Sequence, residues 1–241
     1  MSIARPLAGR LALVTGASRG IGAAVARRLA LSGARVALLA RSGDTLAALV
    51  AEIGDGAVAL VCDVRDTRAL SRALDSLPEF LGGAPGIVVN NAGAFFVAPA
   101  RDTSVDAFAA TLAVNLTAPF AVVRALLPAM SASREGHVVT IGSIADRMAF
   151  PGNAAYAASK YGLRALHEVL RAELKASGVR VSLVSPGPVD TDLWNSIDPD
   201  QQAGFTPRSE MLSPDSVAEA VHWVVTSPAG VNVDELRLSR S

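Results

Sequence analysis

Short apolar runs alternate along the chain with longer segments in which apolar residues recur every three or four positions. The short runs have the length of strands, and some, such as residues 36–39, are apolar at every position, which is typical of strands buried on both faces. The longer segments have the spacing of helices that bury one face. This alternation predicts strand–helix–strand units, which pair their strands in parallel.

The pattern gives seven strands and six helices in one domain. The predicted strands are residues 10–14, 35–40, 57–62, 86–90, 136–141, 179–184 and 235–238. The predicted helices are residues 21–32, 45–53, 67–80, 105–131, 154–177 and 217–226. We therefore expect a single doubly wound α/β domain of Rossmann type over residues 1–241, with a mainly parallel seven-stranded sheet and helices on both faces. The proline-rich segment 186–214 is the least regular, and we expect it to form a loop that covers a substrate site.

Composition narrows the classes of function. The chain has 241 residues, is 51% hydrophobic and carries a net charge of zero, which excludes a disordered chain and argues against nucleic-acid binding. A single cysteine, Cys62, rules out an internal disulfide and fits a cytoplasmic protein, and we expect this side chain only to pack. We find no signal peptide and no apolar run of about 18 residues, so we expect no contact with a membrane.

Three glycines follow the first predicted strand directly, and a predicted helix follows them. Their spacing is Gly16-x-x-x-Gly20-x-Gly22, which differs from the common Gly-x-Gly-x-x-Gly fingerprint. Glycine lets the backbone approach a pyrophosphate closely, and the N-terminus of a helix offers unpaired N–H groups to an anion. The segment therefore predicts a nucleotide site in the first strand–helix unit.

The end of the second predicted strand indicates which nucleotide binds. NAD-binding folds place an acidic residue there, which binds the ribose 2′-hydroxyl. This chain has Arg41 and Ser42 after Ala40, and no acid. The guanidinium groups of Arg41 and Arg19 suit a 2′-phosphate, so we predict a preference for NADP(H).

A tyrosine and a lysine form the candidate catalytic pair. Tyr156 and Lys160 are four residues apart and share one face of a predicted helix. A phenol has an unperturbed pKa near 10 and a nearby ammonium lowers it, so the pair can act as a general acid and base on a ketone and its alcohol. Ser143 follows the fifth strand, at the sheet edge where ligands of this fold bind. Asn115 is a polar residue within an apolar helix, and such a buried group needs a partner.

Together these segments resemble the short-chain dehydrogenase/reductase family over essentially the whole chain. The resemblance rests on residues 15–22, Asp63, residues 90–93, Asn115, Ser143, the Tyr156-x-x-x-Lys160 motif and residues 186–191, in order and at normal spacing. It implies that Tyr156 donates or accepts the proton, and that Lys160 binds the nicotinamide ribose and tunes Tyr156. It also implies that Ser143 orients the substrate carbonyl and that Asn115 holds a water in a proton relay.

The resemblance also implies the cofactor contacts and the assembly. Asp63 would bind the adenine amino group, Asn90 the neighbouring ribose, and Val189 and Thr191 the nicotinamide carboxamide. The full set of expected cofactor-binding residues is Gly16, Ser18, Arg19, Gly20, Ile21, Gly22, Arg41, Asp63, Val64, Asn90, Ala92, Gly93, Tyr156, Lys160, Pro186, Gly187, Val189 and Thr191. Members of the family are commonly cytoplasmic homotetramers or dimers that pair through two long helices, so we expect a homo-oligomer.

The implied reaction is reversible hydride transfer between NADP(H) and a small-molecule ketone or secondary alcohol. Residues expected near the site predict a largely apolar pocket: Phe95, Phe96, Ile144, Met148, Phe150, Leu193, Trp194 and Phe205. The C-terminal part of the chain resembles NADP-dependent 3-hydroxy acid (serine-type) dehydrogenases. A 3-oxoacyl carrier-protein reductase is the alternative, although the glycine-rich ending typical of that group is missing. A non-catalytic redox sensor that binds NADP(H) is a second alternative, against which the intact catalytic set counts.

The remaining charged and titratable residues receive simpler interpretations. Arg147 lies close to Ser143 and could bind a substrate carboxylate, but we expect a solvated charge. The three histidines lack the spacing of metal ligands, so we expect no metal site. Of the 22 basic residues only Lys160 and Lys175 are lysines, and at Lys160 a flexible ammonium is needed where arginine would fit poorly.

Overall fold

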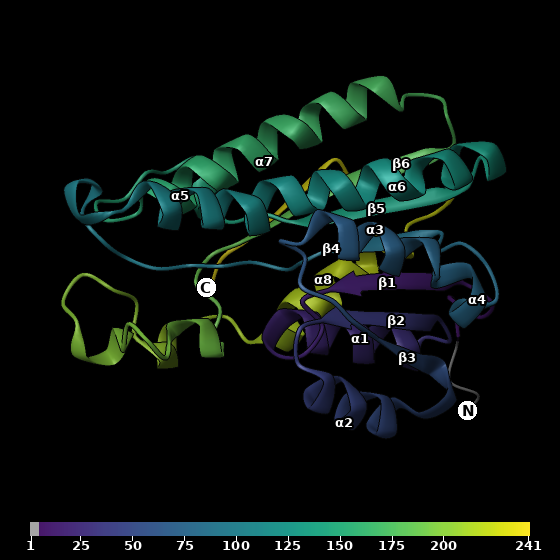
Figure 1. Cartoon of the computed structure of the whole chain (residues 1–241), viewed down its shortest axis with the longest axis horizontal. Helices are drawn as coiled ribbons and strands as arrows, with labels where there is room; N and C mark the ends of the chain where they lie inside the picture. The colour runs from purple at the N-terminus through teal and green to yellow at the C-terminus, as the bar shows by residue number, and fades with distance from the viewer. Residues whose placement is uncertain (1–4) are drawn as a thin grey trace.

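A parallel sheet of seven strands forms the centre of the molecule (Figure 1). The computed structural model describes residues 5–241. The strands are β1 (Leu11–Thr15), β2 (Arg35–Ala40), β3 (Ala57–Val61), β4 (Ile87–Asn90), β5 (Gly136–Ile141), β6 (Val179–Pro186) and β7 (Glu235–Leu238). Their order is β3-β2-β1-β4-β5-β6-β7, and every pairing is parallel. The predicted doubly wound α/β fold is confirmed, and the sheet is parallel throughout rather than mainly so.

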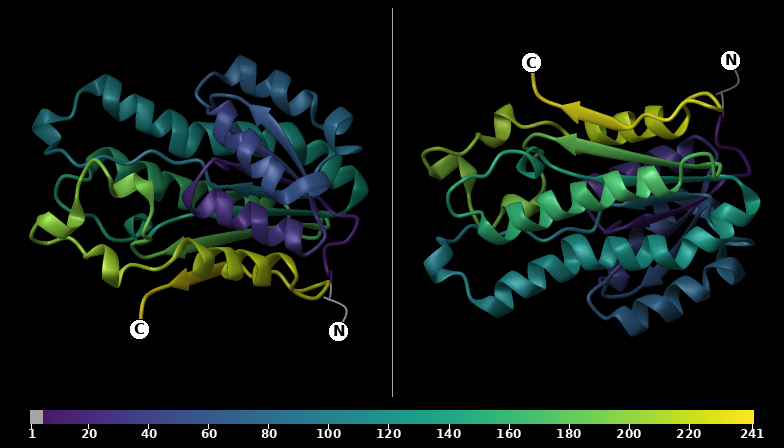
Figure 2. Two further views of the ribbon diagram at one scale, coloured as in Figure 1. Left: turned by 90° about the horizontal axis from the view of Figure 1, so that it is seen from below. Right: turned by 90° about the horizontal axis from the view of Figure 1, so that it is seen from above.

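Helices cover both faces of the sheet and make three layers (Figures 1 and 2). The helices are α1 (Gly20–Leu31), α2 (Gly43–Ile53), α3 (Thr67–Asp75), α4 (Leu77–Leu81), α5 (Val105–Leu112), α6 (Ala118–Ser133), α7 (Ala154–Glu173) and α8 (Pro214–Val225). One apolar core lies between the sheet and α1, α2 and α8, and a second lies between the sheet and α3, α4, α6 and α7. Successive strand residues such as Val88 and Val89 enter opposite cores, which explains the continuously apolar strands.

Side chains near the helix starts explain where several helices begin. The Asp66 carboxylate accepts hydrogen bonds from the backbone N–H groups of Arg68 and Ala69 and so caps α3. Ser104 caps α5 in the same way through Ala107, and Ser213 caps α8 ahead of Pro214 at its first position. Each cap satisfies N–H groups that the helix itself leaves free.

Two predicted helices are interrupted in the structure. The helix expected over residues 67–80 breaks at Ser76 into α3 and α4, because Pro78 cannot continue the hydrogen-bond ladder of a helix interior. The helix expected over residues 105–131 contains a π-turn, Ala113–Thr117, between α5 and α6. A π-turn inserts one extra residue and therefore rotates the faces on either side of it relative to one another.

One helical stretch is long and apolar enough to cross a membrane by length and composition. It is Val105–Ser133, which joins α5, the π-turn and α6, with a mean hydropathy of 1.6 in its most apolar window. The expectation that the chain has no such apolar run is therefore wrong. Buried core helices pass the same test, and Leu126 and Met130 of α6 pack into the second core. Core packing accounts for part of the apolar character of the helix, since 39% of its most apolar window is buried.

The strand order reverses between β1 and β4, which makes this the switch point of the sheet. From β1 the chain proceeds outward to β2 and β3, and it then returns to β4 and proceeds the other way. The connections after β1 and after β4 therefore leave in opposite directions. A crevice opens between them at the carboxyl ends of the strands, where ligands of this fold bind.

Candidate active site

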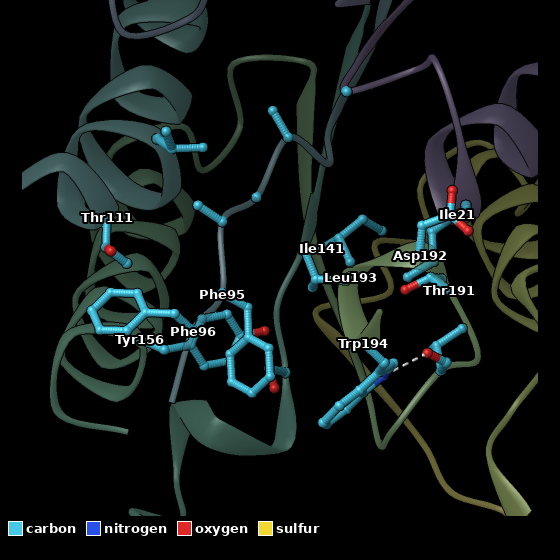
Figure 3. Close-up of a pocket in the computed structure, with 18 of the residues that line it drawn as sticks. Ile21, Phe95, Phe96, Thr111, Ile141, Tyr156, Thr191, Asp192, Leu193 and Trp194 are labelled. Atoms are coloured by element: carbon cyan, nitrogen blue, oxygen red, sulfur yellow. Dashed lines mark hydrogen bonds between the residues drawn. The ribbon is translucent and has the colours of Figure 1, made fainter. Parts of the chain in front are cut away.

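One cavity of about 1350 Å³ occupies this edge of the sheet. It extends from the glycine loop at Gly16–Ile21, past Asp63 at the end of β3, to Tyr156 at the start of α7. Its far wall comes from the loop after β4 and the segment after β6, which face each other across the opening in Figure 3. The cavity is therefore long enough to join a nucleotide site to a substrate site.

The glycine loop has the conformation that a phosphate site requires. Gly16 and Gly20 have φ angles of +65° and +55°, which favour glycine. A Cβ at Gly22 would lie 2.3 Å from the Gly16 carbonyl oxygen, so only glycine allows α1 to start so close to β1. Within the described residues no side chain caps α1, and its first N–H groups remain available to an anion.

A residue that the sequence did not single out holds this loop in place. The side-chain amide of Asn91 donates hydrogen bonds to the carbonyl oxygens of Thr15 (3.0 Å) and Gly16 (3.2 Å). The hydroxyl of Thr15 in turn accepts from the backbone N–H groups of Asn91 and Ala92. The segment after β4 thus clamps the segment after β1 across the switch point. Its neighbours Asn90, Ala92 and Gly93 are expected cofactor contacts, whereas Asn91 is not in that set.

Most of the expected cofactor-binding residues line the cavity, and two do not. Gly22 lies beneath the glycine loop, against Gly16 and Asn91. Asn90 is 3% exposed, and its side-chain amide has no partner among the described residues. The remaining members of the set all border the cavity: Gly16, Ser18, Arg19, Gly20, Ile21, Arg41, Asp63, Val64, Ala92, Gly93, Tyr156, Lys160, Pro186, Gly187, Val189 and Thr191.

Three arginines line the cavity: Arg19 in the glycine loop, Arg41 after β2 and Arg65 after β3. Arg19 and Arg41 are exposed and line the opening, as a site for a 2′-phosphate requires. Arg65 forms an ion pair with Asp63 at 2.6 Å, and its hydrogen bonds hold the pKa of that carboxyl below its usual range. Asp63 therefore remains an acceptor, as a partner for an adenine amino group should.

Tyr156 and Lys160 lie on one face of α7, at the cavity. The Lys160 ammonium is 5% exposed, donates a hydrogen bond to the Ile141 carbonyl oxygen at 2.9 Å and lies 5.6 Å from the centre of the Tyr156 ring. Burial lowers the pKa of Lys160 to about 8. Burial raises the pKa of Tyr156, although a hydrogen bond with Ser143 acts in the opposite direction. The expected lowering of the phenol pKa by Lys160 is not seen, because desolvation of the phenol dominates.

Ser143 and a buried carboxylate beside it form the second part of the site. Ser143 caps a short 3-10 turn, Ile144–Asp146. The side chain of Asp146, the third residue of this turn, accepts a hydrogen bond from the backbone N–H of Ser143. Asp146 is 1% exposed and accepts a hydrogen bond of 2.6 Å from the Ser185 hydroxyl on β6. The negative charge of Asp146 raises the pKa of both Tyr156 and Lys160. The sequence carries no signal for this role of Asp146, because its partner Ser185 lies 39 residues away.

Asn115 occupies the π-turn between α5 and α6. Its side-chain amide donates to the Ala94 carbonyl oxygen and to the Ser159 hydroxyl, each at 2.9 Å, and accepts from the Ala94 N–H at 2.8 Å. The Ser159 hydroxyl donates to the Tyr156 carbonyl oxygen at 2.7 Å. The buried amide thus has the partners that its position demands, and it connects the loop after β4 to the catalytic helix. Its expected role in holding a water remains a prediction.

Comparisons with known proteins agree with this geometry. A model of the short chain dehydrogenase family matches residues 10–202. The chain belongs to the short-chain dehydrogenase family. Over 95% of its length this dehydrogenase is 34% identical to an NADP-dependent 3-hydroxy acid dehydrogenase from Salmonella typhi, and it covers 94% of that protein.

Other relatives of this dehydrogenase have different substrates in their names. It is 33% identical over 92% of its length to a 3-oxoacyl-[acyl-carrier-protein] reductase from Escherichia coli, of which it covers 91%. It is 36% identical to a glycine betaine reductase from Emericella nidulans, of whose length it spans only 19%. The solved structure of a closed serine dehydrogenase with NADP+ superposes with a TM-score of 0.87 at 34% identity, covering 95% of this chain and 94% of that one. The family makes this protein an oxidoreductase and leaves its substrate open.

Arg147 is half-buried and ion-paired, so it is not free to bind a substrate. Its guanidinium bonds both carboxylate oxygens of Glu235 on β7, and its Nε lies 3.5 Å from the Asp146 carboxylate. It is not among the residues that line the cavity. The expectation of a solvated charge is therefore wrong, because the neighbouring edge strand supplies a carboxylate that sequence separation concealed. Arg147 thus neutralises part of the negative charge of Asp146 behind the Ile144–Asp146 turn.

Three aromatic side chains, which we call the aromatic wall, border the cavity beyond Tyr156: Phe95, Trp194 and Phe205. Phe95 packs edge-on against Tyr156 at 4.8 Å and against Trp194 at 5.1 Å, and Trp194 packs against Phe205 at 6.2 Å between ring centres. The Trp194 indole N–H donates to the Val189 carbonyl oxygen at 3.0 Å, the dashed line in Figure 3. Seven of the eight residues expected in the apolar pocket line the cavity, and the exposed Met148 does not.

The segment that carries Trp194 and Phe205 is closed at its base by a small bridge. Val189 and Leu212 pair in parallel, with hydrogen bonds of 2.9 Å from the Leu212 N–H to the Pro188 carbonyl oxygen and from the Asp190 N–H to the Leu212 carbonyl oxygen. Between these residues the chain forms only three short 3-10 turns. The predicted irregular segment is therefore a closed loop over the cavity.

Proposed function

We propose that this dehydrogenase transfers hydride reversibly between NADP(H) and a ketone or secondary alcohol, with Tyr156 as the general acid and base. One observation carries the proposal: Tyr156, Lys160 and Ser143 meet in the same cavity as the glycine loop. The bound nicotinamide supplies or accepts the hydride. The cavity fits such a cofactor, because it offers uncapped N–H groups at α1 and arginines at its far end.

The side chains of the site divide the remaining work of ketone reduction. Ser143 donates a hydrogen bond to the ketone oxygen and holds it next to the phenol. Tyr156 gives its proton to that oxygen as hydride reaches the carbon. Because burial raises the pKa of Tyr156, the phenol carries that proton at neutral pH, and reduction should slow as the pH rises through this pKa. Lys160 binds the nicotinamide ribose.

Replacement of the phenol tests the reaction. In Tyr156→Phe the ring remains and the proton is lost, so turnover should fall by at least about a thousandfold while NADPH binding persists. Turnover with a panel of ketones and NADPH binding by fluorescence measure the two effects. Full activity in this variant would contradict the proposal. Tight NADPH binding by the wild type, with no ketone reduced, would favour the redox sensor instead.

A preference for NADP(H) over NAD(H) is the finer part of the proposal. Arg19 and Arg41 support it, because both border the cavity and the end of β2 carries no acid. Arg41→Ala should raise the KM for NADPH by about tenfold or more, since it removes a charge-assisted contact, and should leave the KM for NADH unchanged. Arg27→Ala is a matched control, because Arg27 bonds Glu52 on the protein surface. Equal wild-type rates with both cofactors would contradict the preference.

The assembly, the location and the loop also belong to the proposal. We expect a homo-oligomer in the cytoplasm, with the loop at residues 186–214 acting as a lid. Exposed Phe120 on α6 and exposed Tyr161 and Val169 on α7 support pairing through these helices, which lie side by side in Figures 1 and 2. Sedimentation should give a dimer or tetramer, and Phe120→Asp should lower its mass.

A 3-oxoacyl carrier-protein reductase remains the second candidate. The identity with the Escherichia coli reductase favours it, while the absence of a glycine-rich run in residues 227–238, after the last helix, counts against it. Rates with a 3-oxoacyl group on its carrier protein and with the same group on a small thiol separate the two. A strong preference for the carrier protein would favour this second candidate.

A further inference from the structure

The part of the cavity beyond Tyr156, which we call the substrate half, indicates the substrate class that the family leaves open. Six large apolar side chains border it: Phe95, Phe96, Phe150, Leu193, Trp194 and Phe205. The aromatic wall is continuous with the catalytic phenol through the contact between Phe95 and Tyr156. Edge-to-face packing of this kind stabilises a further ring placed against it. A group bonded to the reacting carbon would therefore meet aromatic surfaces first.

The charged side chains that line the cavity lie at its nucleotide half, except Lys160, which lies beside the phenol. Among the described residues, those that line it are Arg19, Arg41, Asp63, Arg65, Lys160 and Asp192. Lys160 is bonded to Ile141 beside the phenol, and Asp192 lies 3.9 Å from Arg19. In Figure 3 Asp192 lies with Ile21 on the glycine-loop side, away from Phe96 and Tyr156. Arg147, the remaining cation near Ser143, is already paired with Glu235.

The polar group nearest the start of α7 is neutral. Asn153 lines the cavity, is 9% exposed, and its side-chain oxygen is buried with no partner among the described residues. The amide carries no charge, so its NH2 group can offer a carboxylate at most a neutral hydrogen bond and not an ion pair. A carboxylate placed here would lose its hydration without gaining a cation, which is costly.

We infer that the substrate is a neutral ketone with an aryl or similarly bulky apolar group seated against the aromatic wall, and that a free carboxylic acid on the same skeleton is a poor substrate. This inference rests on the proposed function, since it names the substrate class of the same site. It separates this chain from its relatives that are named for hydroxy acids. The wall determines specificity, while Ser143 and Tyr156 perform the chemistry.

A pair of substrates that differ by one charge tests the inference. Methyl 4-oxo-4-phenylbutanoate and 4-oxo-4-phenylbutanoate share the ketone and the ring, and the charge lies away from the reacting carbon. With NADPH and the wild-type enzyme we expect kcat/KM for the ester to exceed that for the acid by at least about tenfold. Equal values, or a faster acid, would overturn the inference and leave the proposed function intact. If NADPH binds and neither compound nor any other ketone is reduced, the proposed function fails and the inference with it.

Variants of Trp194 test the role of the wall. Trp194→Ala should lower kcat/KM for 1-phenylpropan-2-one by about tenfold and change that for butan-2-one much less. Trp194→Phe keeps a ring but loses the hydrogen bond to Val189. It therefore distinguishes the effect of the aromatic wall on activity from the effect of the hydrogen bond that anchors the loop. It should retain most of the preference for the aryl ketone. Trp223→Ala is the control, because Trp223 is exposed on α8 and does not line the cavity. An equal loss with both ketones in Trp194→Ala would overturn the inference.

Discussion

Buried polar groups lie at both ends of the β5–β6 pair, and the two ends differ in what surrounds them. At the amino end His137 is fully buried and bonds the Ser182 hydroxyl at 2.8 Å, and it does not line the cavity of the active site. At the carboxyl end Asp146, Ser185 and Lys160 are equally buried, but they support side chains that line a cavity of about 1350 Å³.

The comparison shows that burial and a shifted pKa do not by themselves mark a functional site. Burial lowers the pKa of His137 to about 3 and that of Lys160 to about 8. The histidine is held neutral inside a packed sheet, where no ligand can reach it. The lysine lies beside a phenol that a ligand can reach. Access from the cavity separates a group that supports the fold from one that supports chemistry.

The largest expected effect comes from the carboxyl end. Lys160→Arg should lower kcat by about a hundredfold or more, because a planar guanidinium does not fit a site where the ammonium is 5% exposed and a small misplacement is costly. The matched control is Lys175→Arg at the other lysine, which is exposed, and it should change kcat by less than about twofold. Steady-state kinetics with one ketone measures both. Activity of Lys160→Arg near the wild-type level would remove the distinction between the two ends.

A smaller effect should follow from the carboxylate behind the catalytic turn. Asp146→Asn keeps the shape but removes the charge, and we expect kcat to fall by about tenfold as Ser143 loses its fixed position. Because the charge of Asp146 raises the pKa of Tyr156, the decline of ketone reduction at alkaline pH should begin at lower pH in the variant. The pH profile of kcat measures this shift.

Glu235→Gln is the control for the loss of a charge one contact further from the site. It removes the carboxylate that pairs with Arg147 and leaves Asp146 in place. The alkaline decline of kcat should therefore shift less than in Asp146→Asn. An unchanged pH profile in Asp146→Asn would show that this carboxylate only supports the fold, as the groups at the amino end do.

At the amino end the effect should appear in stability and not in turnover. The folded pKa of His137 is about 3, below its ordinary value of 6.5, so the unfolded chain binds a proton that the folded chain refuses. This contribution to stability is complete above pH 6.5 and decreases as the pH falls toward 3. Relative to His137→Leu, the wild type should lose about 2 kcal/mol of unfolding free energy between pH 7.5 and pH 5.0.

Urea unfolding at the two pH values measures that difference, and turnover at pH 7.5 should agree within about twofold. The same pH dependence in both proteins would show that His137 titrates in the folded state. A large loss of turnover in folded His137→Leu would mean that the two ends of the strands are coupled.

The fold could be predicted from the sequence because its information is local. A run such as residues 36–39 reveals a buried strand by apolar content alone, and Gly16, Gly20 and Gly22 reveal the nucleotide loop by spacing. The interruptions of two predicted helices were harder to predict. Pro78 was a visible signal for the break after α3, whereas the apolar spacing of residues 105–131 does not distinguish an α-helix from one that contains a π-turn.

The catalytic side chains were predicted by motif, and their supports were not. Tyr156 and Lys160 are close in sequence, so a helix brings them together. Asp146 with Ser185, Arg147 with Glu235, and Asn91 with Thr15 are pairs between strands far apart in the chain. Such pairs depend on strand order, which the sequence of one chain does not specify residue by residue. The wrong expectation for Arg147 has this origin.

The bridge between Val189 and Leu212 has a consequence for how this enzyme could be altered. The two residues fix the ends of the intervening chain, which donates no ladder hydrogen bonds to β6 or β7. That chain is therefore a self-contained loop whose two ends are joined by the bridge. A different stretch in place of residues 193–211, which leaves Thr191 in the cavity, could be exchanged into it and would alter the choice of substrate, while the nucleotide pocket and the strands would keep their geometry.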